Sequence, residues 1–141
     1  MKRVLIVEDE IAVLMALSRI VTDMGLVSIH AGSVASGLAQ IGPHVDLVLL
    51  DLQLPNGHGF EVLRAIAERR NDIPVIVVSA HAQEESHEAP VPIMEWIQKP
   101  FKSTQLREAI ERGCRFSTSL ETMRRTTDRM ERFSQSHGTN A

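Results

Sequence analysis

Val4-Leu5-Ile6-Val7, followed directly by Glu8-Asp9, decides the fold: it is an apolar run that ends in two carboxylates. Four further short apolar runs occur along the chain, at residues 26–29, 47–50, 73–78 and 94–98. Short runs with apolar residues on both faces are typical of strands that are buried in a parallel sheet. The pattern therefore predicts five strands that share one core.

Amphipathic segments separate these runs and predict helices. The expected helices cover residues 11–24, 33–41 with Ser33 as N-cap, a segment through Phe60 and Ile66, residues 83–89, and a segment that starts at Ser103. The fourth is expected to be short and irregular, because Pro90 and Pro92 follow it. Strands that alternate with helices indicate an α/β fold, with a doubly wound parallel sheet between two helical layers.

Composition limits the class of protein. The chain has 141 residues, a formal net charge of −3 and a single cysteine, Cys114, which excludes an internal disulfide framework and a multi-cysteine metal site. No apolar stretch is long enough for a membrane span or a signal peptide, so we expect a cytoplasmic protein without membrane contact. The charges near the C-terminus alternate in sign, which does not favour nucleic-acid binding.

Polar side chains follow four of the five predicted strands at the point where the strand ends. Glu8 and Asp9 follow the first, Asp51 the third, Ser79 the fourth and Lys99 the fifth. The carboxyl ends of parallel strands lie at one edge of the sheet, so these groups are expected to converge. Each alone could be a helix cap, a turn residue or a solvated charge; together they predict a site.

The residue types at this site suit magnesium-assisted phosphoryl chemistry. Mg²⁺ prefers oxygen ligands, which Asp9 and Asp51 can supply, with Glu8 holding a coordinated water and the backbone carbonyl of Gln53 adding another oxygen. An aspartate can also accept a phosphoryl group as an acyl phosphate. An ammonium group such as that of Lys99 would neutralise charge on the transferred group.

Four blocks carry a resemblance to a known family: Glu8-Asp9, Asp51-Leu52-Gln53-Leu54-Pro55 with Gly59, Ser79-Ala80, and Lys99-Pro100-Phe101. In this order and spacing, they resemble the receiver domain of bacterial two-component response regulators, the CheY-like superfamily. The resemblance covers about residues 1–115. It implies a flavodoxin-like (βα)5 fold and a signalling protein rather than an enzyme.

The resemblance implies a role for each site residue. Asp51 would be the phosphoacceptor, Asp9 a direct Mg²⁺ ligand with Glu8 behind it, Ser79 the hydroxyl that moves to the phosphoryl group, and Lys99 its ion-pair partner. The donor would be a sensor histidine kinase or a histidine phosphotransfer protein.

Further positions follow from the same resemblance. The Lys99–Pro100 peptide is expected to be cis. Trp96 occupies the family's switch position, where Tyr or Phe is usual, and packing in the core is an equal alternative. Gln53 and His81 occupy positions that, in the family, tune the phosphoryl lifetime.

Residues 116–141 are expected to form a separate helical extension to a receiver domain at residues 1–115, with a disordered end at 134–141. Its apolar residues Phe116, Leu120, Met123 and Met130, together with Thr127, follow one another at alternating spacings of four and three residues. This spacing predicts a helix that pairs with a second copy or a partner protein, or one that covers the globular domain. No DNA-binding or catalytic domain fits in this segment, so we expect output through contact with a downstream protein.

Two other functions remain open at this stage. A receiver-like adaptor could bind partners independently of phosphorylation, which the altered fourth helix and Trp96 would favour. An aspartate-nucleophile phosphatase is the remote alternative, because enzymes of the haloacid-dehalogenase type carry a second aspartate where this chain has Gln53.

Overall fold

The computed structural model describes residues 1–69 and 72–138, except for the side chains of residues 135–138. Its centre is a five-stranded, wholly parallel sheet with the strand order β2-β1-β3-β6-β7. The strands are β1 (Arg3–Val7), β2 (Val27–Ala31), β3 (Leu47–Leu50), β6 (Val75–Ser79) and β7 (Glu95–Gln98). The predicted doubly wound, flavodoxin-like (βα)5 fold is confirmed, with strand ends that lie within two residues of the prediction.

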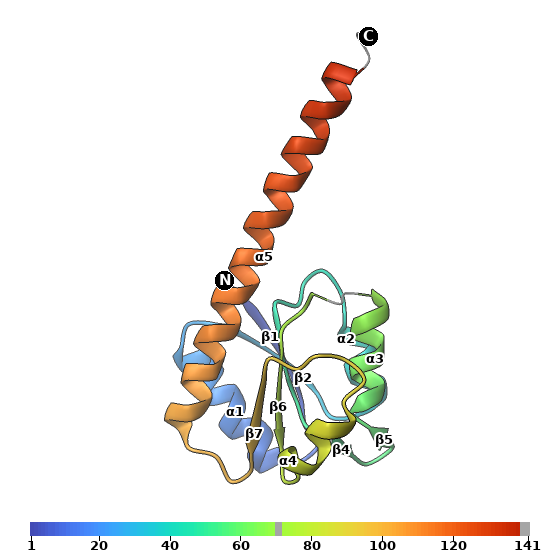
Figure 1. Cartoon of the computed structure of the whole chain (residues 1–141). Helices are drawn as coiled ribbons and strands as arrows, with labels where there is room; N and C mark the ends of the chain where they lie inside the picture. The colour runs from blue at the N-terminus through green and yellow to red at the C-terminus, as the bar shows by residue number, and fades with distance from the viewer. Residues whose placement is uncertain (70–71, 139–141) are drawn as a thin grey trace.

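Helices cover both faces of the sheet (Figure 1). Helices α1 (Ile11–Asp23) and α5 (Ser103–Gly138) pack on one face, while α2 (Val34–Gln40) and α3 (Phe60–Arg69) pack on the other. Alternate residues of each central strand enter opposite cores: Val4 and Ile6 lie on the α1/α5 side, and Leu5 and Val7 on the α2/α3 side. This double burial explains why the central strands β1, β3 and β6 are apolar along almost their whole length, whereas the edge strands β2 and β7 carry polar residues.

The start of α2 is set by a local signal that the sequence shows. The Ser33 side chain accepts a hydrogen bond from the backbone N–H of Ser36 at 3.1 Å, and the Ser36 hydroxyl in turn accepts one from the backbone N–H of Ser33. This reciprocal capping box satisfies two N–H groups that a helix start leaves unpaired. The predicted N-cap at Ser33 is confirmed.

The segment between β6 and β7 is short and irregular, as predicted. Helix α4 spans only Ala82–Glu85 and continues as the 3₁₀ turn η1, Ser86–Glu88. The structure also contains a small antiparallel hairpin, β4 (Gln53–Leu54) and β5 (Gly57–His58), which was not predicted.

Helix α5 differs from the prediction in two respects. It runs unbroken through Gly113 into the segment after residue 115, where a separate extension was expected, and that glycine serves close packing: a Cβ there would lie 2.7 Å from Leu47 Cδ1. It also continues through residues 134–138, where disorder was expected, and residues 139–141 lie outside the described part of the chain. The division into domains at 115/116 stays a prediction. Figure 1 shows the far half of α5 projecting beyond the sheet.

Candidate functional site

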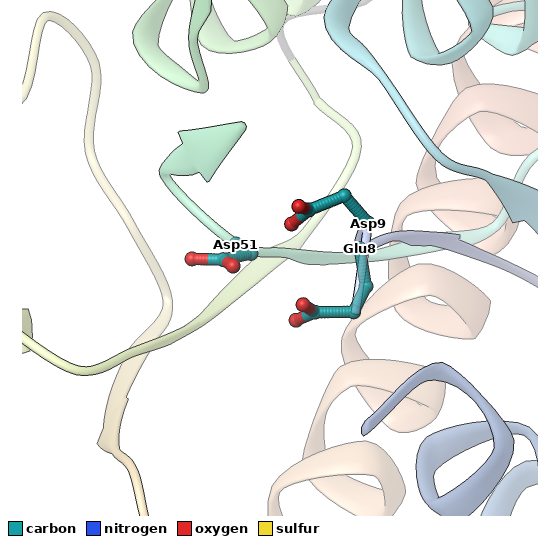
Figure 2. A group of neighbouring side chains, drawn as sticks. All are labelled: Glu8, Asp9 and Asp51. Carbon is teal, nitrogen blue, oxygen red and sulfur yellow. The ribbon is translucent and has the colours of Figure 1, made fainter. Parts of the chain in front are cut away.

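Three carboxylates meet at the carboxyl edge of the sheet. Glu8 and Asp9 follow β1, Asp51 follows β3, and one oxygen from each lies within 4.8 Å of the others. Their carboxyl groups face a common space in Figure 2. Glu8 and Asp51 are buried, whereas Asp9 is exposed. The strand register explains the meeting, because Val7 is aligned with Leu50 and the next residues of both strands are therefore neighbours. This all-oxygen donor set fits a hard cation such as Mg²⁺.

Lys99 supplies the positive charge of the cluster. Its Nζ donates to Glu8 Oε2 at 3.0 Å and to Asp51 Oδ2 at 3.2 Å. Burial raises the pKa of Glu8, and the Lys99 ammonium offsets this only in part. Burial opposes the charge of Lys99, but its bonds to both carboxylates outweigh that effect and raise the pKa of its ammonium group. Lys99 is therefore held as a cation between Glu8 and Asp51.

Asp51 is also held by the backbone around it. Its Oδ1 accepts a hydrogen bond from the Gln53 N–H at 3.1 Å, so each carboxylate oxygen has a donor from this chain. The Gly59 N–H donates to the Leu52 carbonyl at 2.8 Å, which closes the loop that carries β4 and β5. The hydrogen bonds from Gln53 and Lys99 therefore fix the orientation of the Asp51 carboxylate.

Ser79, at the end of β6, is fully buried and takes part in a chain of hydrogen bonds. Its Oγ donates to Glu85 Oε1 at 2.6 Å, and Glu85 Oε2 pairs with His58 Nε2 at 3.1 Å. Sequence reasoning missed Glu85 and His58. The only local signal was an acidic pair in the segment after Ser79, since His58 and Glu85 are 27 positions apart and meet only in the folded chain.

Comparison with known proteins identifies the family. Residues 4–111 match the sequence model of the response regulator receiver domain. The chain belongs to this family. Receiver domains act in phosphorylation-dependent two-component signalling, bind Mg²⁺ at an acidic site, and interact with histidine kinases and downstream effectors. They are signalling domains, not classical enzymes.

Two relatives from Escherichia coli (strain K12) illustrate the sequence similarity. The KDP operon transcriptional regulatory protein KdpE is 35% identical over 104 residues, which cover 72% of this chain and 46% of KdpE. The phosphate regulon transcriptional regulatory protein PhoB is 29% identical over 110 residues, covering 74% of this chain and 48% of PhoB. The receiver chain spans about half the length of the curated relatives it matches.

Solved structures agree with the fold. A CheY-like receiver domain from Methanospirillum hungatei JF-1 superposes with a TM-score of 0.74 at 29% identity, covering 84% of this chain and 98% of that one. The response regulator TrrA from Thermotoga maritima, solved in complex with Mg²⁺-BeF, has a TM-score of 0.73 at 27% identity and covers 80% of this chain and 99% of its own.

The structure also places the remaining predicted positions of the receiver domain. The Lys99–Pro100 peptide is cis. Trp96, on β7, is half-buried and packs against the α2/α3 core. Gln53 and His81 are both exposed near the cluster, and the metal contact expected from the Gln53 carbonyl stays a prediction. Among the described residues, no helix combines the length and apolar character that crossing a bilayer requires.

Proposed function

We propose that this receiver domain accepts a phosphoryl group on Asp51 from a phosphohistidine donor, either a sensor histidine kinase or a histidine phosphotransfer protein. One observation carries the proposal: Asp51 is a buried carboxylate whose two oxygens are oriented by Lys99 Nζ and the Gln53 N–H, beside Glu8 and Asp9. An oriented carboxylate next to fixed positive charge is prepared for nucleophilic attack on phosphorus.

Each group of the site has a part in this transfer. An oxygen of Asp51 forms the new bond to phosphorus while the phosphorus–nitrogen bond of the donor breaks, and the imidazole keeps the bonding pair and takes up a proton. Lys99 neutralises charge on the transferred group. Asp9 and Asp51 would hold Mg²⁺, with Glu8 behind them and the Gln53 carbonyl as a further oxygen. When bound, that ion supplies additional positive charge for the phosphoryl oxygens.

The acyl phosphate then acts as a switch. In this proposal, the Ser79 hydroxyl moves to donate a hydrogen bond to a phosphoryl oxygen. Trp96, on the neighbouring strand β7, then changes its position and transmits the movement of Ser79 to the surface formed by α4 and β7. Gln53 and His81, exposed beside the site, are assigned to tuning the phosphoryl lifetime. The output is contact with a downstream protein in the cytoplasm, with no nucleic acid or membrane involved.

Intact-protein mass spectrometry after incubation with Mg²⁺ and acetyl phosphate tests the proposal. Wild type should gain one phosphoryl group, Asp51→Asn should gain none, and Asp23→Asn, an exposed aspartate on α1, should behave as wild type. Equal labelling of Asp51→Asn would remove Asp51 from the role. If folded wild type is labelled neither by acetyl phosphate nor by phosphohistidine donors, the adaptor that works without phosphorylation becomes the better explanation. The irregular α4 region is the observation that favours this adaptor.

Helix α5 is proposed to pair with a second copy of the chain. Ion pairs of Lys2 with Glu121, at 3.2 Å, and of Arg124 with Asp72 connect it to the globular part. Beyond them, Met130 is 66% exposed. Met123 is 65% exposed and lies seven residues before it on the same helical face. Phe116 and Leu120 continue this face toward the domain.

Light scattering on the whole chain tests the pairing. We expect the mass of a dimer for wild type and of a monomer for the double variant Met123→Gln/Met130→Gln. Met15→Gln is the matched control, since Met15 is equally exposed at 66% but lies on α1. A monomeric wild type would contradict the dimer.

A further inference from the structure

We propose that Glu85 is a positioning residue that holds the Ser79 hydroxyl before phosphorylation and competes for it with the phosphoryl group on Asp51. The inference rests on the proposed function and deepens it. It makes α4 the element that is released when the phosphoryl group arrives.

The hydrogen bond between Ser79 and Glu85 is a strong one. Ser79 Oγ lies 2.6 Å from Glu85 Oε1, within the short range for a hydroxyl bound to a carboxylate. Ser79 has no exposed surface, so water cannot easily take over either side of this bond. A serine hydroxyl carries one proton and donates to one acceptor at a time. Ser79 therefore cannot serve Glu85 and a phosphoryl oxygen together.

The Glu85 carboxylate is fixed from its other side. His58 Nε2 lies 3.1 Å from Glu85 Oε2, and the Phe60 N–H approaches His58 Nδ1 at 3.1 Å. Since Nδ1 accepts this bond, the proton of the neutral imidazole is assigned to Nε2, which donates to Glu85. The Glu85 side chain is only 13% exposed, so its position is well defined by these contacts.

The same hydrogen bonds connect the hairpin and α4 to the acceptor site. His58 pairs with Gln53 across the β4–β5 hairpin, and the Gln53 N–H donates to Asp51. Helix α4 has only four residues, and Ala82 is its one buried side chain, so the two bonds of Glu85 are a large share of what holds it. If the Ser79 hydroxyl donates instead to a phosphoryl group on Asp51, Glu85 loses this hydrogen bond and α4 loses one of the contacts that hold it.

The affinity for beryllofluoride with Mg²⁺, as a phosphoryl mimic, tests the competition. It is measured by Trp96 emission or by fluorine NMR of the bound mimic. Glu85→Ala should bind about tenfold to hundredfold more tightly than wild type, the range expected when a hydrogen bond to a charged group no longer has to be broken. Glu85→Gln, which keeps an acceptor without the charge, should fall between them. Glu88→Ala, an exposed glutamate on η1, should match wild type.

A double-mutant cycle separates competition for Ser79 from a general effect of removing negative charge. In the Ser79→Ala background, Glu85→Ala should no longer tighten binding. Unchanged or weaker binding by Glu85→Ala, or an equal gain without the Ser79 hydroxyl, would overturn the inference. If wild type takes up neither beryllofluoride nor a phosphoryl group, both the proposed function and the inference about Glu85 fail. Binding by wild type with no response to Glu85→Ala makes the competition alone fail.

Discussion

Gly59→Ala tests whether close backbone packing fixes the phosphoacceptor loop. A Cβ at Gly59 would lie 2.7 Å from the Asp51 carbonyl oxygen, 2.7 Å from Leu52 Cα and 2.8 Å from Leu52 Cδ2. Ordinary contacts begin at 3.4 Å, so the loop would have to move by roughly 0.7 Å. Two of the three atoms belong to the backbone, and no change of side-chain rotamer can relieve the clash.

The expected cost follows from this geometry. Overpacking of a well-packed site costs about 1–3 kcal/mol. Alanine recovers about 0.4–1 kcal/mol of it, because it restricts the unfolded chain more than glycine does. We therefore expect Gly59→Ala to lower the free energy of unfolding by about 1–2 kcal/mol. Gly32→Ala is the matched control, since the nearest atom to its Cβ, the Glu8 carbonyl oxygen, lies at 4.0 Å. It should be neutral or slightly stabilising.

Urea denaturation followed by circular dichroism gives both free energies, and acetyl phosphate labelling reports the position of Asp51. Gly59→Ala should lose both stability and labelling, because the clash displaces the backbone that carries the acceptor. If Gly59→Ala is as stable as Gly32→Ala and is labelled as fully as wild type, the loop is not held in the way described.

Three further predictions concern the charges of the site and one helix cap. Burial raises the pKa of Glu8 above the ordinary 4.5, so its ionised form reduces stability at neutral pH. Glu8→Gln should therefore raise the melting temperature at pH 7 without Mg²⁺. The difference from wild type should disappear below pH 4.5, where Glu8 is protonated in both the folded and the unfolded chain, and a difference that persists there would contradict the prediction. Lys99→Met leaves Glu8 and Asp51 without their cation and should cost about 3–5 kcal/mol in urea denaturation without Mg²⁺. Saturating Mg²⁺ should reduce this loss, and an unchanged loss would contradict the shared role of the two cations. Ser33→Ala removes the N-cap of α2 and should cost about 1 kcal/mol in urea denaturation; an unchanged midpoint would mean that the capping box contributes nothing.

The amino-acid sequence was sufficient for the sheet, its helical layers and the meeting of the acidic residues. Strands that are apolar on both faces must be buried on both faces, and the ends of parallel strands share one edge. These are consequences of local pattern and of strand direction. The irregular α4 and the cap at Ser33 could be predicted for the same reason, because prolines and capping hydroxyls act on their sequence neighbours.

Tertiary structure alone decided how the side chains around that edge are partnered. The position of Lys99 between Glu8 and Asp51, and the link from Ser79 through Glu85 to His58, join residues that lie on different elements of the fold. Gly113 lies inside the unbroken helix α5, where a Cβ would lie 2.7 Å from Leu47 Cδ1 of β3, and the glycine alone does not reveal this close packing. Periodicity records which face of an element is buried, but the partner that a buried polar group finds depends on where separate loops meet in space.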